Sequence, residues 1–411
     1  MPSATRRHSI RHIAFLDDGL DQPLCLNATK TDYSGPLVDW LLRDAWLLQT
    51  AGELTVQFGR AMIAAGIPLW RISVGIWTLH PQLAGRGYIW HRDGGPAEDF
   101  NTPHGTLSTP GYLNSPVRHV SEGLGGVRQR LDVAGATEFR FPVMEELRQR
   151  GGTDYVAMPL PFSDGQITTM TLTSDEPAGF TTADLGMVFQ CLFGLSRFYE
   201  TMTLRQNTST LLTKYLGKRS GSRVLNGETQ RGAGEEITAA ILTCDLRDST
   251  QLAASLPRLA YLDLLNEFFE TVADPILSRW GEVLKFIGDG VLAIFPVDGD
   301  PGDACAAARD AAVEIISALA ETTDPTLRCA IGLHVGEVTF GTVGAPERLD
   351  FTVIGSAAAI SARLSDQCKV MEQSLLLSGA VQQAQGEDLH ALGRFDLHNV
   401  PEPTEIFTVQ A

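Results

Sequence analysis

The chain has 411 residues, of which 44% are hydrophobic and 20% charged, and its formal net charge is −17. This length is enough for two ordinary domains and too great for one small core, and the composition is typical of globular proteins. The acidic residues are spread along the chain without a basic block, which argues against nucleic acid or an anionic membrane surface as the main partner.

The sequence shows no targeting segment and no disulfide framework. The N-terminal run MPSATRRHSIRHIAFLDDG is too polar for a signal peptide, and no stretch approaches the roughly 18 apolar residues that span a bilayer. The six cysteines are scattered without a CxxC pair, and the nine histidines have no metal-ligand spacing. We therefore expect a cytoplasmic protein that binds no membrane.

The first half of the chain predicts a small domain of mixed type. Residues 1–36 are polar and contain Pro and Gly, which predicts a weakly ordered extension. The apolar spacing of residues 37–65 predicts helix, and the alternation in residues 68–80 predicts a strand. Residues 93–115, rich in Gly, Pro, Asn and Ser, are expected to form a long loop.

Further along, two alternating runs and a capping pattern predict a hairpin and a helix. Residues 153–162 and 166–174 flank Ser-Asp-Gly at 163–165, as in a β-hairpin. The Thr-x-x-Asp pattern that begins at Thr181 predicts a helix start. The apolar spacing of this helix is typical both of a coiled-coil seam and of a core-facing helix; its positions are Val188, Leu192, Leu195, Tyr199 and Met202.

The polar residues 206–236 predict a linker between two domains. After it, a strand is expected to end at Asp245, and a long helix is expected to end or kink near Pro275. The alternation that follows predicts an α/β sandwich with helices on one face of a sheet. Its other expected members are helices at 303–320 and up to Leu364, and strands at 327–335, 349–354, 374–378 and 405–409.

The stretch GEVLKFIGDGVLAIFP, residues 281–296, is the most informative local pattern. Two apolar runs flank Gly288, Asp289 and Gly290, and glycine adopts turn conformations that other residues resist. The pattern therefore predicts a hairpin with Asp289 at its tip, four residues after Lys285. An acid and a base held rigidly in this way indicate a site.

A second acid, Asp245, ends a neighbouring strand. Two carboxylates on adjacent strands suit Mg²⁺, which prefers oxygen ligands and keeps positions open for substrate phosphates. Two such ions activate an attacking oxygen and neutralise a leaving one. Taken separately, helix capping by Asp245 and turn formation by Asp289 are the simpler explanations.

Five ordered motifs change that balance. DLRDST, KFIGDG, GLHVGEVTFGTVG, RLDFTVIG and SARL follow one another in the second half of the chain. Together they resemble the catalytic domain of class III nucleotidyl cyclases, the adenylate and guanylate cyclase family, over residues 237–411. The resemblance implies a ferredoxin-like α/β (α+β) fold that works as a head-to-tail homodimer with two active sites across its interface.

The resemblance also implies roles for individual residues. Asp245 and Asp289 match the two metal-binding aspartates, with the backbone carbonyl of Leu246 as a further ligand, for two Mg²⁺ or Mn²⁺ ions per active site. Lys285 matches a purine-reading position at which lysine marks ATP and glutamate marks GTP. The ammonium donates to N1 of adenine, whereas guanine presents N–H groups there. Thr352 matches the second purine-reading position, and threonine there is typical of bicarbonate-responsive adenylate cyclases.

Arg363 matches the arginine that stabilises charge on the transferring phosphate, a task suited to a fixed guanidinium. In the family, the metal aspartates act with the lysine, threonine and arginine of the other chain. Lys285 and Asp289 would then serve different active sites, and a monomer would be inactive.

Three positions depart from the family pattern, and one of them, Ser249 in place of a common phenylalanine, is tolerable variation. The asparagine that orients the ribose is replaced by Ala359, and the lost contact would cost roughly 10- to 1000-fold in rate. A common arginine is replaced by Ala330, and the nearby Arg328 is expected to be a surface residue rather than a triphosphate ligand.

The segment 151–185 resembles the later part of a GAF domain, a class that commonly binds small molecules or dimerises. We therefore expect an extension at 1–36, a GAF-like regulatory domain at 37–205, a linker at 206–236 and a catalytic domain at 237–411. The sequence does not identify a ligand of the GAF-like half.

The expected activity is that of an adenylate cyclase, which converts ATP to 3′,5′-cyclic AMP and pyrophosphate. One alternative is a cyclase-like module that binds nucleotide and is weakened by Ala359. The retention of both aspartates together with Lys285, Thr352 and Arg363 argues against it. A guanylate cyclase is the second alternative, and Lys285 argues against that.

Overall fold

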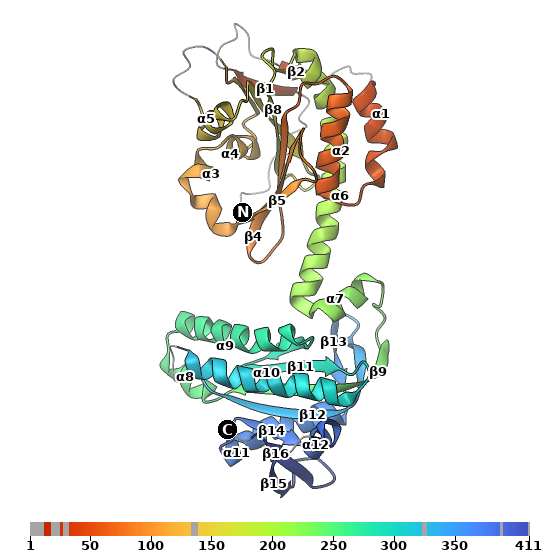
Figure 1. Ribbon diagram of the computed structural model, residues 1–411, viewed down its shortest axis with the longest axis vertical. Coiled ribbons are helices and arrows are strands. Elements are labelled where there is room, and N and C mark those ends of the chain that lie inside the picture. The colour runs from red at the N-terminus through yellow and green to blue at the C-terminus, as the bar shows by residue number, and fades with distance from the viewer. Residues whose placement is uncertain are drawn as a thin grey trace. The chain divides into compact units, whose positions relative to one another are not determined.

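The computed structural model describes residues 12–17, 25–27, 33–132, 139–322, 327–386 and 389–409, the first two segments by their backbone only. The chain divides into two compact units, Met1–Leu211 and Leu212–Ala411 (Figure 1). Within the described ranges, no helix has the length and apolar character needed to cross a bilayer.

The first unit is built on one mixed sheet. Its described strands lie in the order β2-β1-β6-β7-β8-β3-β4-β5, and β1 pairs parallel with β6 whereas the other neighbours are antiparallel. The strands are β1 His12–Asp17, β2 Cys25–Asn27, β3 Arg71–Trp77, β4 Leu83–His91, β5 Glu98–Pro103, β6 Gly126–Arg130, β7 Asp154–Pro161 and β8 Ile167–Ser174.

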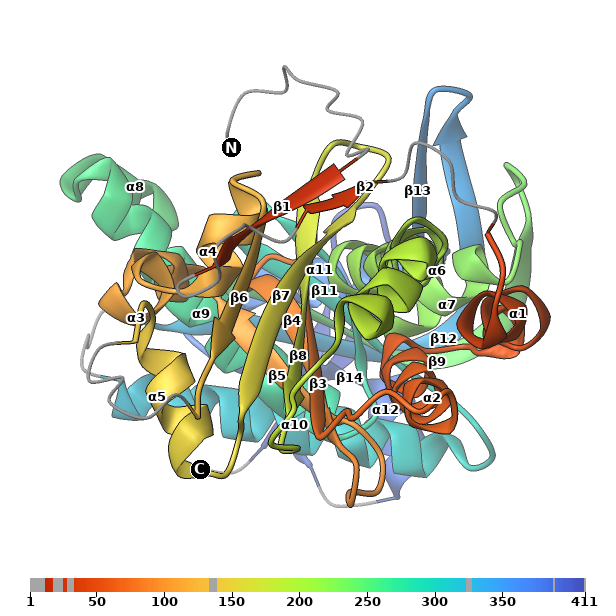
Figure 2. The ribbon, with the colours of Figure 1, turned by 90° about the horizontal axis from the view of Figure 1, so that it is seen from above.

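Helices cover both faces of this sheet. Figure 2 shows β6, β7, β8 and β3 between α4 and α5 on one side and α2 and α6 on the other. The larger apolar core lies on the α2 and α6 side, and a smaller one lies under α4 and α5. The helices are α1 Pro36–Arg43, α2 Ala51–Ala64, α3 Pro110–Leu113, α4 Pro116–Ser121, α5 Pro142–Gln149 and α6 Thr182–Leu216, with 3₁₀ turns at Ala45–Leu47 and His104–Ser108.

Several predictions for this half are confirmed. Strands β7 and β8 form the expected hairpin, with Gly165 at a φ of +91° in its turn. Thr181 and Asp184 make the reciprocal capping bonds that start α6, at 2.8 and 3.1 Å. The apolar positions of α6 from Val188 to Met202 are buried in the core of the unit, so this part is a core-facing helix.

Two expectations for this half are wrong. Residues 1–36 are not simply a weakly ordered extension, because β1 and β2 within them join the sheet and β1 finds a partner in the distant β6. The stretch 93–115 is not one long loop. It contains strand β5, which pairs with β4, and helix α3, whose start is capped by Thr109.

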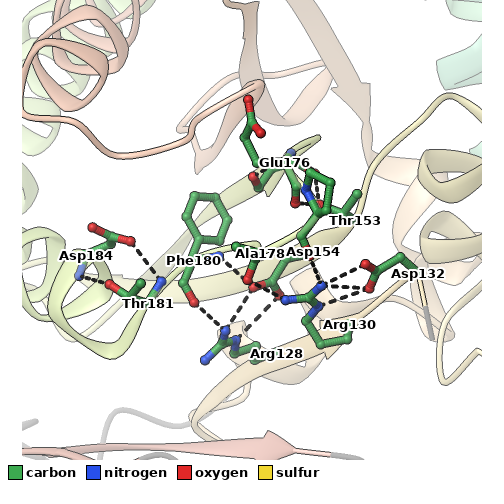
Figure 3. Close-up of polar contacts among 12 residues, drawn as sticks. Arg128, Arg130, Asp132, Thr153, Asp154, Glu176, Ala178, Phe180, Thr181 and Asp184 are labelled. Carbon is green, nitrogen blue, oxygen red and sulfur yellow. Dashed lines mark hydrogen bonds and ion pairs between the residues drawn. The ribbon is translucent and has the colours of Figure 1, made fainter.

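A buried polar network holds the loop that leads into α6 (Figure 3). Asp154 is fully buried and pairs with Arg128, whose Nη2 lies 2.9 Å from its Oδ2. The same guanidinium donates to the carbonyl of Phe180, and the N–H of Phe180 donates to Asp154. The carboxylate and the guanidinium thus provide hydrogen-bond partners for the backbone N–H and carbonyl groups of Phe180, just before α6 begins.

The second unit is built on a second sheet. Its described strands lie in the order β10-β11-β9-β12-β14-β16-β15, and β13 pairs with β12 off this path. The strands are β9 Gly234–Leu246, β10 Glu282–Ile287, β11 Gly290–Pro296, β12 Cys329–Ala345, β13 Arg348–Ile354, β14 Leu375–Ser378, β15 His390–Phe395 and β16 Thr404–Thr408. The helices are α7 Lys218–Leu225, α8 Ser249–Ser255, α9 Arg258–Ser278, α10 Pro301–Glu321, α11 Ser356–Met371 and α12 Gly379–Gln385.

The second sheet has helices on both faces, not on one as expected. Helices α9 and α10 pack over the larger apolar core, which includes Leu242 and Phe268. Helix α11 packs on the opposite face, where a Cβ at Gly332 would lie 2.1 Å from the carbonyl oxygen of Ser361. The missing side chain at Gly332 therefore lets this helix approach the strand closely.

One helix ends where expected and another does not. Helix α9 ends at Ser278, close to Pro275 as expected, because a proline removes one of the hydrogen bonds that would continue the helix. Helix α11 runs past Leu364 and ends at Met371. The next residue, Glu372, has a left-handed φ of +55°.

Candidate active site

Asp245 and Asp289 come together at one edge of the second sheet. Asp245 lies near the end of β9 and is directly opposite Gly290 of β11. The N–H of Leu246 donates to the carbonyl oxygen of Asp289 at 3.2 Å, which ties the hairpin turn to the end of β9. A Cβ at Gly290 would lie 2.4 Å from Oδ1 of Asp245, so glycine leaves the space that this carboxylate occupies.

This edge suits a divalent cation that prefers oxygen ligands. It offers the carboxylates of Asp245 and Asp289 and the adjacent carbonyl of Leu246, and Mg²⁺ completes such sets with water and substrate phosphates. In the part of the chain that the structure describes, no group of three or more His, Cys, Asp or Glu side chains forms a full ligand cage. Lys369 of α11 places its Nζ 3.3 Å from Oδ2 of Asp245.

Lys285 lies next to the strand that carries Thr352. Its ammonium forms an ion pair with Asp350, two residues before Thr352 on β13. The register of β10 against β11 shifts between Val283 and Lys285, and irregular strand pairing re-aims side chains. Thr352 itself is 8% exposed and lies opposite Gly341.

The residue after Lys285 points to the other side of the sheet. Phe286 packs against Phe269 of α9, with their ring centroids 4.5 Å apart. Because side chains alternate along a strand, this contact directs Lys285 toward β13 and away from α9.

Arg363 and Ala359 lie one turn apart on α11, and therefore on the same side of the helix. Ala359 is exposed, and the guanidinium of Arg363 is 3.0 Å from Asp366. Among the described contacts, none joins Arg363 to Asp245, Asp289 or Lys285. A single chain thus brings the two aspartates together and pairs Lys285 with β13, but leaves Arg363 apart.

Arg328 lies at the surface, as expected. Its guanidinium is 2.9 Å from Asp248, and the two side chains are 63% and 57% exposed. The neighbouring Ala330 is fully buried and lies opposite Asp245 on β9.

The sequence reasoning missed two charged residues of this region. Asp350 is two residues before Thr352, and residues at this spacing lie on the same face of a strand. The position of Thr352 in the sequence therefore indicates that Asp350 lies near the site. Lys369 has no comparable signal, because its contact with Asp245 depends on how α11 packs across β9.

Residues 233–389 match the family model of the adenylate and guanylate cyclase catalytic domain. Two uncharacterized proteins of Mycobacterium tuberculosis are similar to part of the chain. Rv1320c is 34% identical over 188 residues, which are 45% of this chain and 32% of the relative. Rv1318c is 34% identical over 197 residues, which are 46% of this chain and 35% of the relative. The chain thus spans about a third of the length of these relatives.

Solved structures of cyclases are also similar to part of the chain. A bacterial light-regulated adenylyl cyclase is 29% identical with a TM-score of 0.38, over 43% of this chain and 91% of that chain. The guanylyl cyclase Cya2 is 26% identical with a TM-score of 0.38, over 43% of this chain and 95% of that chain. These structures include cyclases named for either nucleotide and do not distinguish between ATP and GTP.

Proposed function

Because residues 233–389 carry an adenylate and guanylate cyclase catalytic domain, we propose that the chain is an adenylate cyclase. It would join the ribose 3′-oxygen of ATP to the α-phosphorus and release pyrophosphate. The observation that carries the choice of nucleotide is the position of Lys285, which is held by Asp350 beside the strand of Thr352.

Lys285 and Thr352 would read the purine. An ammonium has only donors, and it suits the unprotonated N1 of adenine. Guanine carries a hydrogen on N1 and an exocyclic amine beside it, so both would face the ammonium as donors. The hydroxyl of Thr352, a residue that is 8% exposed, can donate or accept, and it would complete the contact to the adenine edge.

Asp245, Asp289 and the carbonyl of Leu246 would hold two Mg²⁺ or Mn²⁺ ions, which supply activation of the attacking oxygen and charge neutralisation at the leaving group when bound. The close approach allowed by Gly290 supports this role. Lys369 would release Asp245 for this task, since a half-exposed ion pair is weak.

Arg363 would stabilise negative charge on the phosphate in the transition state. It has no described contact with Asp245 or Asp289 of its own chain, which supports a head-to-tail homodimer in which it serves the partner's copies of these two aspartates. Each of the two sites would take its aspartates from one chain and Lys285, Thr352 and Arg363 from the other.

The first unit would regulate this activity as a GAF-like domain that binds a small molecule. Its fold, with a sheet covered by helices on both faces, and the direct passage of α6 out of its core support the proposal. Deletion of residues 1–205 should then change either the basal rate or its response to small molecules. An unchanged rate and response would contradict regulation by this unit.

The test of the activity is direct. The purified chain is incubated with Mn²⁺ and either ATP or GTP, and the cyclic nucleotide is quantified. We expect cyclic AMP, with ATP preferred over GTP. Cyclic GMP as the main product would make the chain a guanylate cyclase, and no product from either nucleotide would favour a module that only binds nucleotide.

A further inference from the structure

Glu282 is a buried carboxylate of the second unit that the proposed mechanism does not use. It begins strand β10, three residues before Lys285, and is 6% exposed. A buried carboxylate is costly unless hydrogen bonds compensate for the lost water, so its partners indicate what it does.

All of the described hydrogen bonds of the Glu282 side chain go to helix α7. Its Oε1 accepts from the backbone N–H groups of Arg219 and Ser220, each at 3.1 Å, and from Oγ of Ser220 at 3.2 Å. N–H groups in the first turn of a helix have no acceptor within the helix, and a negative charge is favoured at that end. Glu282 therefore caps α7 from a strand.

Among the described residues, no other side chain caps α7 at this end. The residue that precedes α7 is Gly217, which has no side chain and separates α7 from α6. Its φ is +87°, and a Cβ there would lie 2.7 Å from Oε1 of Glu282. Glycine is thus required both by the backbone turn and by the space that the carboxylate occupies.

Helix α7 also contacts β13, the strand that carries Thr352. Arg223 lies over the rings of Phe340 and Phe351, 5.4 and 5.8 Å from their centroids. Phe351 immediately precedes Thr352 on β13. Helix α7 therefore touches the strand of Lys285 through Glu282 and the strand of Thr352 through Arg223.

We propose that Glu282 is a positioning residue that fixes β10, and with it Lys285, to helix α7. The proposal rests on the proposed function, in which Lys285 reads the purine. The cap acts through one oxygen, since Oε2 is buried and has no hydrogen-bond partner in the described ranges. Because α6 leads into α7 through Gly217, a displacement of α6 would reach β10 and Lys285 through this cap.

The test compares Glu282→Ala and Glu282→Gln in the full chain, with Glu270→Gln on an exposed position of α9 as control. In Glu282→Ala, hydrogen exchange at the amides of Arg219 and Ser220 should be about 10-fold faster. The KM for ATP should rise and the preference for ATP over GTP should fall by roughly 5-fold. Thermal unfolding should remain cooperative.

Glu282→Gln keeps an oxygen that accepts hydrogen bonds, so it should retain slow exchange and the preference for ATP, as should the control. Unchanged exchange in Glu282→Ala would overturn the cap. Faster exchange with unchanged KM and nucleotide preference would overturn the positioning role. If the wild-type chain makes no product, the proposed function fails instead, and the relative binding of ATP and GTP to each variant decides the positioning role.

Discussion

At the scale of single residues, the site combines a full set of charged groups with one missing polar contact. Both aspartates, Lys285 and Arg363 are present, whereas the exposed Ala359 offers neither a donor nor an acceptor one turn before Arg363. Its methyl group would leave the ribose free to rotate away from the attack geometry. Positioning of this kind is worth several kcal/mol in enzymes.

Ala359→Asn should therefore raise the turnover number by roughly 10- to 1000-fold, because the new amide would orient the ribose. The measurement is cyclic AMP formation at saturating ATP and Mn²⁺. Val370→Asn, on an exposed position of the same helix, controls for a general effect of asparagine on α11. An equal rate in the wild type and in Ala359→Asn would show that Ala359 does not limit turnover.

Lys369→Ala should lower the Mn²⁺ concentration for half-maximal activity by about 2- to 5-fold, because the ammonium no longer competes for Asp245. Stabilisation of the chain by Mn²⁺ in thermal unfolding gives a second readout that needs no turnover. Lys214→Ala, an exposed position of α6, is the matched control. If Lys369→Ala needs the same Mn²⁺ concentration for half-maximal activity as the wild type, the ion pair does not oppose metal binding.

At the scale of elements, turns and helix starts could be predicted from the sequence, whereas contacts between distant segments could not. The turn at Gly288 and Asp289, the hairpin of β7 and β8 and the capped start of α6 depend on residues close in sequence, and all three are confirmed. Strand β1 depends on pairing with β6, more than a hundred residues away, and its sequence alone does not reveal this. The contact of Lys369 with Asp245 is unpredictable for the same reason.

The stability of the second unit should depend on pH, because a histidine is buried where β12 packs against β14. Burial lowers the pKa of His334 on β12 from 6.5 to about 4, and its Nδ1 lies 2.7 Å from Oγ of Ser378. The folded state therefore keeps this imidazole neutral, while the unfolded chain takes up a proton as the pH falls below 6.5. The stability that neutral His334 contributes is retained above that pH and is lost progressively between about pH 6.5 and 4.

Between pH 7 and pH 5, His334 should cost the folded second unit about 2 kcal/mol. Urea unfolding of the wild type and of His334→Gln at both pH values measures this, because glutamine does not titrate. From pH 7 to pH 5, the free energy of unfolding should fall by about 2 kcal/mol more in the wild type than in His334→Gln. Equal losses would show that His334 does not titrate differently in the folded and unfolded states.

At the scale of the whole molecule, the proposed active site requires two copies of the chain. A single chain holds Asp245 and Asp289 at one sheet edge and directs Lys285 toward β13, and no described contact links Arg363 to either aspartate. The composite site therefore predicts that two defects on different chains can be complementary. It also explains why Lys285 and Asp289 share one hairpin without sharing an ion pair.

The most direct test of the composite adenylate cyclase site mixes two inactive variants, Lys285→Ala and Asp289→Asn, and measures cyclic AMP formed from ATP. Each variant alone should retain at most about 1% of the wild-type rate. In a fully exchanged equal mixture, half of the dimers are mixed and each holds one intact site. The mixture should therefore recover about a quarter of the wild-type rate. A mixture as inactive as its components, with mixed dimers present, would contradict the account.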